Sequence, residues 1–190
     1  MEKENKESTD EELIIAIVSG NHEPFAQLVR RHARRFYSLA YRILSNREEA
    51  EDIVQESFLL LWESPDKWDS SEETRFTTWF YKIILNRCLD RKKKAKETSI
   101  SLDHQILDES RDAETIISMT RMREQVEKDI KDLPQSQQIA LNLCFYEGIK
   151  NKDAAEIMGI SIKALESLLM RAKYTLRSKL KSVNNIKEVV

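Results

Sequence analysis

The fold of this chain is best predicted starting from residues 50–96. They contain the segments AEDIVQESFLLLW (50–62), SPDKWDSSEET (64–74) and RFTTWFYKIILNRCLDRKKKAK (75–96). The first segment is acidic and amphipathic, the second is a short polar loop, and the third changes from aromatic to basic. Helix-spaced apolar residues in the first and third segments predict two helices joined by the loop. The change from acid to base indicates two partners, a protein on the acidic helix and a nucleic-acid backbone on the basic one.

Composition predicts an all-α fold of two small helical domains. The chain has 190 residues but only 3 glycines and 3 prolines, which leaves few turn signals and favours long helices. Charged residues make up 34% of the chain, yet the net charge is only -2, whereas basic DNA-binding domains are usually positive. The charges are segregated along the chain, so local patches matter more than the sum.

Two further helices are predicted before the acidic one. Thr9 or Asp10 is placed to cap a helix that ends at Val18, and Pro24 is placed in the first turn of a helix with a single apolar stripe. Four arginines lie largely off that stripe and are interpreted as a solvated face: Arg30, Arg31, Arg34 and Arg35. Asn46 is expected to cap the acidic helix.

The acidic helix has two faces at helical spacing. One is apolar and predicted to be buried, and the other carries Asp52, Gln55, Glu56 and Leu59. Acids and an amide around one exposed leucine favour a protein-docking strip. Periodicity alone is equally consistent with an ordinary exposed helix face.

The basic helix offers a candidate surface for nucleic acid. Most of its aromatic residues are expected to be core, whereas Trp68 stands in the loop, where a large aromatic ring either packs back or binds something. Basic and amide side chains recur around the apolar face and are suited to follow a phosphate backbone: Lys82, Asn86, Arg87 and Arg91.

The C-terminal part predicts a helix-turn-helix after an extended polar linker. Two helices are joined by the turn Met158–Gly159–Ile160, and Ser161 is placed to cap the second helix. Its outward side chains have the geometry for reading a major groove: Lys163, Glu166, Ser167, Met170, Arg171 and Tyr174. The predicted domains are 10–95 and 115–182, with a linker over 96–114 and tails over 1–9 and 183–190.

Several classes of protein are excluded. Cys88 and Cys144 are isolated from each other and from histidines, so we expect no metal site and no cofactor, and two buried or half-buried thiols instead. No phosphate loop or clustered catalytic set is present, which argues against an enzyme. The N-terminus is polar and acidic, and no apolar run approaches the roughly 20 residues of a membrane span, which predicts a cytoplasmic protein.

Three stretches in this order resemble the extracytoplasmic-function (ECF) class of sigma factors, in the bacterial sigma-70 family. They are EEAEDIVQESFLLLW, FTTWFYKIILNRCLDRKKK and LPQSQQ followed by EGIKNKDAAEIMGISIKALESLLMRAK. The resemblance covers residues 10 to about 180. It implies a region 2 domain that melts the promoter and a region 4 helix-turn-helix domain, joined by a flexible linker.

The resemblance also implies partners and roles. The face formed by Asp52, Gln55, Glu56 and Leu59 would dock on the beta-prime subunit of RNA polymerase core, while the linker would run through the channels of the polymerase, which also contains the beta subunit. The loop and the following helix would engage the minus-ten element, with Lys82, Ile83 and Asn86 at matching positions. Trp68, Arg87 and Arg91 are expected to contact the same DNA. Ser167, Met170 and Arg171 would read the minus-thirty-five element, with Ser161 and Lys163 at nearby phosphates. An anti-sigma partner is also expected.

The recognition helix departs from the pattern of many relatives, because it carries Ala164, Glu166, Leu168 and Met170. Glu166 is suited to accept a hydrogen bond from a cytosine amino group, or it forms a salt bridge with a neighbour. The alternative function is a helix-turn-helix regulator that acts without being a polymerase subunit. That alternative leaves the acidic helix and the aromatic-basic helix without a role.

Overall fold

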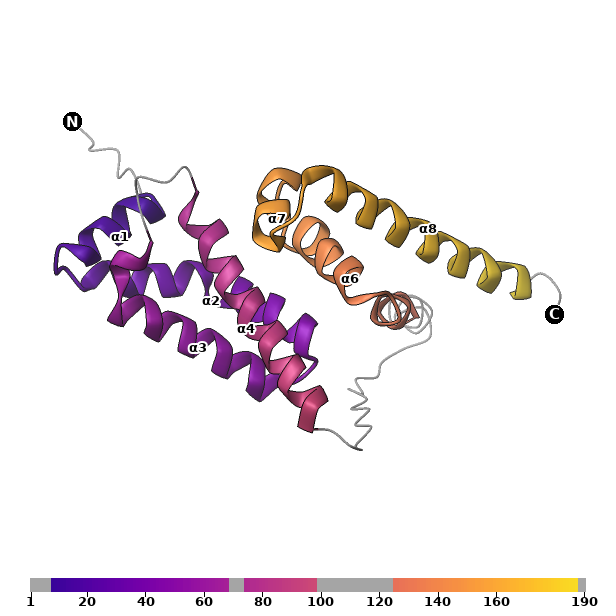
Figure 1. Cartoon of the computed structure of the whole chain (residues 1–190), viewed down its shortest axis with the longest axis horizontal. Helices are drawn as coiled ribbons and strands as arrows, with labels where there is room; N and C mark the ends of the chain where they lie inside the picture. Colours follow the sequence, from indigo (N-terminus) through magenta and orange to yellow (C-terminus); the bar gives the residue numbers. More distant parts are fainter. Residues whose placement is uncertain (1–7, 69–73, 99–124, 188–190) are drawn as a thin grey trace, which may run out of the picture.

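The computed structural model describes residues 8–68, 74–98 and 125–187, and all regular structure in these ranges is helical (Figure 1). Residues 125–131 also form a helical segment, which has no label of its own. The elements are α1 (Asp10–Val18), α2 (Glu23–Leu44), α3 (Arg47–Glu63), the 3-10 turn η1 (Pro65–Lys67), α4 (Phe76–Thr98), α6 (Gln135–Leu141), the π-helical turn η2 (Asn142–Tyr146), α7 (Asn151–Met158) and α8 (Ile162–Lys187). The predicted all-α fold is confirmed.

The first domain, α1 to α4, is built around a cluster of aromatic rings. The ring centroids of Phe36 and Phe80 are 4.6 Å apart, and Phe58 lies 4.9 Å from Phe80. Phe76 packs on the same cluster at 5.4 Å from Phe80, and Phe36, Phe76 and Phe80 are fully buried. Aromatic pairs at this spacing add to the stability gained from burial, so the cluster ties α2, α3 and α4 into one body.

Capping residues fix where the first helices begin, as the sequence predicted. The Thr9 side chain accepts a hydrogen bond from the Glu12 amide, and Glu12 accepts one from the Thr9 amide in return. Asn46 accepts from the Glu49 amide at 3.2 Å and begins α3. Each cap satisfies an amide that would otherwise lack a partner at a helix start.

A carboxylate anchors α1 to α2. Asp10 accepts from His32 Nε2 at 2.8 Å and from Arg31 Nη1 at 3.0 Å, and its side chain is 18% exposed. Burial by itself raises the pKa of Asp10, but the hydrogen bonds from His32 and Arg31 outweigh it and hold the pKa below its usual value.

We expect Asp10→Asn to lower the free energy of unfolding by about 1–2 kcal/mol at neutral pH, because it removes hydrogen bonds to a charged group. The pKa of Asp10 lies below 3.8 in the folded state, so this contribution is present above that pH and is lost as the pH falls through the folded pKa. Urea unfolding measured from neutral pH down to about pH 3 should show the difference from wild type shrinking. Asp66→Asn, at an exposed carboxylate on η1, is the control, and a difference that does not change with pH would contradict the assignment.

The second domain is formed by α6, η2, α7 and α8 around a smaller apolar core. Leu143, Ile157 and Leu165 are fully or almost fully buried there. Gly159 ends α7 with φ 65°, and the Ile160 amide donates to the Ala155 carbonyl at 3.0 Å. A left-handed residue at this position closes the tight turn that the sequence predicted, and glycine adopts it without steric cost.

The element boundaries differ from the predicted domain limits at two places. α4 continues to Thr98, past the predicted boundary at residue 95, because lysine, alanine and glutamate are strong helix formers. α8 continues to Lys187, past the predicted end at 182. Residues 99–114 of the predicted linker, 1–7 of the N-terminal tail and 188–190 of the C-terminal tail fall outside the described residues.

The two groups of helices are in contact, since α7 packs against α4 and η2 packs against α2. Cys88 is buried and Cys144 half-buried, as expected, and burial raises the pKa of the Cys88 thiol to about 12. None of the helices in the described ranges is both long enough and apolar enough to cross a membrane.

Candidate functional site

The predicted docking face on α3 is open to solvent. Asp52, Gln55 and Glu56 are exposed, and Leu59 is 53% exposed among them. One turn further on, Trp62 is 41% exposed, with its ring 4.5 Å from the ring of His22 and 5.0 Å from that of Phe25. Sequence reasoning missed Trp62, although its i+3 spacing from Leu59 is the signal that places it on the same face. The face therefore combines acids with an apolar strip.

Glu56 is not simply an exposed acid. Its carboxylate lies 2.7 Å from Arg87 Nη1 and 3.6 Å from Arg91 Nη2 on α4. These pairs are half exposed, so each contributes at most about 1 kcal/mol. The two ion pairs nevertheless hold Arg87 and Arg91 against α3. A DNA phosphate therefore has to compete with Glu56 for both guanidinium groups. Asp52 makes no ion pair with any residue of the described ranges.

The α4 surface proposed to meet nucleic acid is a narrow stripe. Lys82 and Asn86 are exposed and Ile83 is half-buried between them, whereas Phe76, Phe80 and Tyr81 are buried. The expectation that most of the aromatic residues are core is confirmed. The stripe offers one cation, one amide and an apolar edge, which is enough to hold a phosphate, hydrogen-bond a base and contact its ring.

Trp68 is buried, which corrects its predicted place as a DNA contact. Its side chain packs edge-on against Phe76 with centroids 6.4 Å apart, and the residue is only 6% exposed. Its indole N–H donates to the Thr74 carbonyl oxygen at 3.3 Å. The ring packs back into the core because this gains apolar burial and still satisfies its one donor. Trp68 thus fixes both ends of the loop, whose residues 69–73 lie outside the described ranges.

We expect Trp68→Phe to lower the free energy of unfolding by about 1–2 kcal/mol, because the smaller ring leaves a void and the indole hydrogen bond is lost. The affinity of the polymerase-bound protein for promoter DNA should stay within about twofold, since no DNA contact is removed. Chemical unfolding and a filter-binding titration measure the two effects. A large loss of DNA affinity in a stable variant would contradict this and show that Trp68 contributes to DNA binding.

The recognition helix α8 presents the predicted side chains. Ser161 Oγ accepts from the Ala164 amide at 3.2 Å and caps the helix, while Leu165, Leu169 and Ala172 are buried. The outward residues are exposed or, for Ser167, half-buried: Lys163, Glu166, Ser167, Met170 and Arg171. Glu166 forms no salt bridge with any residue of the described ranges, so its carboxylate remains available as an acceptor.

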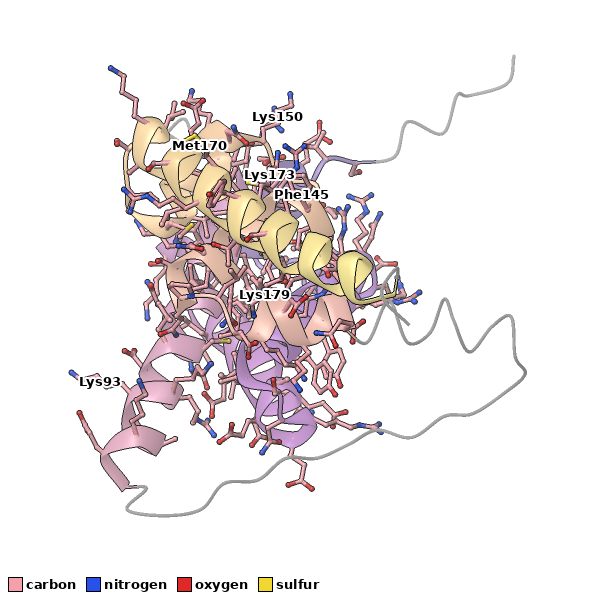
Figure 2. The ribbon with its side chains drawn as sticks, turned by 90° about the vertical axis from the view of Figure 1, so that its right-hand side faces the viewer. Lys93, Phe145, Lys150, Met170, Lys173 and Lys179 are labelled. Carbon is pink, nitrogen blue, oxygen red and sulfur yellow. The ribbon has the colours of Figure 1, made fainter. Side chains whose placement is uncertain are left out.

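The exposed face of α8 also includes Tyr174, as the sequence predicted. Tyr174 is 77% exposed, one turn beyond Met170, which is 66% exposed. Figure 2 shows Met170 and Lys173 on α8 with Phe145 close by, and the Lys173 ammonium lies 4.7 Å from the centre of the Phe145 ring. Lys93, near the end of α4, lies far from this group in the same view. The two candidate nucleic-acid surfaces are therefore on separate domains.

Comparison with known protein families identifies both domains. Residues 28–98 match the family described as Sigma-70 region 2, and residues 123–176 match the family described as Sigma-70, region 4. The chain is similar to the RNA polymerase sigma factor SigV of Bacillus subtilis, with 30% identity over 155 residues, covering 78% of this chain and 86% of SigV. It is 25% identical to the ECF RNA polymerase sigma factor SigW of the same organism over 178 residues, covering 88% and 94%.

The fold is also found among solved structures. The sigma factor RpoE of Bartonella quintana, in a co-crystal structure with the anti-sigma factor NepR, aligns with a TM-score of 0.64 at 21% identity. The alignment covers 83% of this chain and 96% of that chain. At this level of identity the likeness shows a shared fold.

Proposed function

The chain belongs to the ECF class of the sigma-70 family, and on that premise we propose how its two domains divide the work of promoter recognition. It is an RNA polymerase sigma factor that directs transcription initiation. A sigma factor is a non-catalytic subunit of the polymerase, so the chain is not an enzyme. The observation that supports the division of work is that the domains expose distinct surfaces. The first domain exposes the docking face and the α4 stripe, and the second exposes the α8 face.

The docking face, formed by Asp52, Gln55, Glu56 and Leu59, binds RNA polymerase core through the beta-prime subunit. Exposed Leu59 supplies apolar area, and the surrounding acids supply charge that steers a basic partner and sets its register. Trp62 extends the apolar part of this face. Because Glu56 also holds Arg87 and Arg91, docking there is coupled to the neighbouring α4 surface.

The α4 stripe engages the minus-ten element and stabilises the opened strand. Lys82 is placed for a phosphate and Asn86 for a base edge, with Ile83 between them. Arg87 and Arg91 contribute positive charge from the side, at the cost of weakening their pairs with Glu56. This arrangement favours a single strand, since one exposed amide and one apolar edge contact a base only when it leaves the duplex.

The α8 face reads the minus-thirty-five element in the major groove. Ser161 and Lys163, at the start of the helix, hold phosphates, while Glu166, Ser167, Met170 and Arg171 point toward base edges. Arg171 is suited to a guanine and Glu166 to a cytosine amino group.

We infer two further properties from the family. The domains extend over 10–95 and 115–182, connected by residues 96–114, and the protein acts in the cytoplasm, where core polymerase and promoters meet. The fold likeness to a sigma factor crystallised with an anti-sigma factor supports a regulatory protein of that kind as a further partner.

Permanganate footprinting of the polymerase complex tests this division of work. Joint replacement of Lys82 and Asn86 by alanine should remove the reactivity of unpaired thymines at the minus-ten element but preserve protection of the minus-thirty-five element. Lys93→Ala, which removes an exposed lysine from the end of the same helix, is the matched control. Normal opening in the double variant would contradict the role of the α4 stripe.

A further inference from the structure

A carboxylate of α1 caps the beginning of α4. The Phe76 amide, at the first residue of α4, donates a hydrogen bond to Glu11 Oε1 at 3.2 Å, across 65 positions of sequence. Glu11 is half-buried, and α1 contacts both η1 and α4. The first amides of a helix have no partner inside the helix, so an acceptor from elsewhere has to satisfy them. Glu11 supplies that acceptor from a different helix.

The start of α4 has no capping group in its own sequence. The residue before it is Arg75, whose guanidinium only donates hydrogen bonds, and the first turn contains no acidic residue. A cation is unfavourable at the positive end of the helix dipole, whereas a carboxylate is favourable there. By contrast, α3 has its own cap at Asn46 and two glutamates in its first turn. The start of α4 therefore depends on Glu11 for both a hydrogen bond and a negative charge.

The rest of α1 holds the Glu11 carboxylate in place. The preceding residue, Asp10, accepts hydrogen bonds from His32 and Arg31 of α2 at 2.8 and 3.0 Å. On the inner side of α1, Ile14 is fully buried and Ile17 is 2% exposed. Because the helix that carries Glu11 is already fixed by these contacts, the cap costs little further conformational entropy.

The capped end of α4 adjoins the residues proposed to meet the minus-ten element. Phe76 is fully buried, and its ring packs edge-on against Trp68, whose indole N–H donates to the Thr74 carbonyl oxygen. Arg75, between Thr74 and Phe76, is exposed and lies on the same helix face as the α4 stripe. The hydrogen bond from Phe76 to Glu11 therefore fixes the point at which the DNA-facing side of α4 begins.

We propose that Glu11 is a positioning residue for promoter opening, because its cap holds the first turn of α4 in the form that engages the opened strand. Without the cap, this turn has to become ordered when DNA binds, and that ordering weakens the complex. This inference rests on the proposed function, because it takes the α4 stripe as the minus-ten surface. It assigns a role to α1, which the proposed function leaves without one.

Amide hydrogen exchange of the free, full-length protein, followed by NMR, tests the cap directly. In Glu11→Ala the Phe76 amide should exchange at least about fivefold faster, whereas in Glu11→Gln, whose side-chain oxygen still accepts, it should stay close to wild type. Glu12→Ala is the matched control, because that carboxylate caps α1 itself through the Thr9 amide at 2.8 Å, and it should leave Phe76 unchanged. Unchanged exchange of Phe76 in Glu11→Ala, or an equal increase at amides throughout the chain, would overturn the cap.

Promoter opening by the polymerase complex tests the positioning role. Glu11→Ala should lower the permanganate reactivity of the minus-ten thymines about fivefold, and Glu11→Gln should restore most of it. Affinity for core and protection of the minus-thirty-five element should stay as in wild type, whereas a general loss of folded protein would lower both. Normal opening by Glu11→Ala, or an equal loss in Glu12→Ala, would overturn the positioning role and leave the sigma-factor assignment intact. Failure of the assignment itself would appear in the wild type, as absence of promoter-specific transcription with core.

Discussion

Asp52→Lys is expected to abolish measurable binding to core RNA polymerase while leaving the stability of the protein unchanged. Asp52 is exposed and has no ion pair in the described ranges, so its replacement breaks nothing inside the domain. In the complex, the new lysine would stand against a basic partner, and a like-charge contact costs several kcal/mol, or a hundredfold and more in affinity. Titration of labelled protein with core, followed by fluorescence anisotropy, measures the loss.

The structure also identifies the matched control for this substitution. Glu51→Lys makes the same charge change one residue earlier, turned about 100° around α3, and loses only an exposed pair with Arg47. Glu56→Lys is a poor test, because it would place a cation against Arg87 and Arg91 and disturb the packing of α3 on α4. Full core affinity in folded Asp52→Lys would remove this face from the polymerase interface.

Arg171→Ala is expected to weaken recognition of the minus-thirty-five element by about 1–3 kcal/mol, or roughly 5- to 150-fold. Arg171 is exposed on the outer face of α8, where a guanidinium reaches guanine O6 and N7 together. Affinities of the polymerase complex for matched promoters that differ only in the minus-thirty-five element measure the effect. The loss should be large for the preferred element and small for the altered one.

Arg177→Ala is the control for this second prediction, because Arg177 is exposed further along α8 and outside the proposed contact set. It should weaken binding to all sequences slightly and equally. If Arg171→Ala also weakened binding equally on every sequence, Arg171 would be a phosphate contact. The other residues of the α8 face would then have to recognise the bases.

The helices and their exposed faces could be predicted from sequence because they follow local rules. Caps at Thr9, Asn46 and Ser161 were predictable from residue type, and Gly159 from the turn it closes. The outward positions of α3 and α8 followed from helical spacing alone. These features depend on neighbours within about one turn of helix.

Whether Trp68 is buried and which residues pair with Glu56 depend on tertiary structure, so neither could be predicted from the sequence. A tryptophan in a loop has the same local signature whether it packs back or faces a ligand, and only the position of Phe76 and the Thr74 carbonyl decides. The Glu56–Arg87 pair joins residues 31 positions apart, and the Arg42–Glu147 pair joins residues 105 positions apart. No periodic pattern in either segment indicates such contacts.

The most direct test of the central claim is transcription from a pool of genomic fragments by purified core polymerase, with and without this protein, with start sites mapped by sequencing. We expect starts to cluster downstream of one shared pair of minus-thirty-five and minus-ten sequences only when the protein is present. If core initiates at the same places with and without it, while the protein alone binds duplex DNA tightly and specifically, the chain acts as a DNA-binding regulator and the account is contradicted.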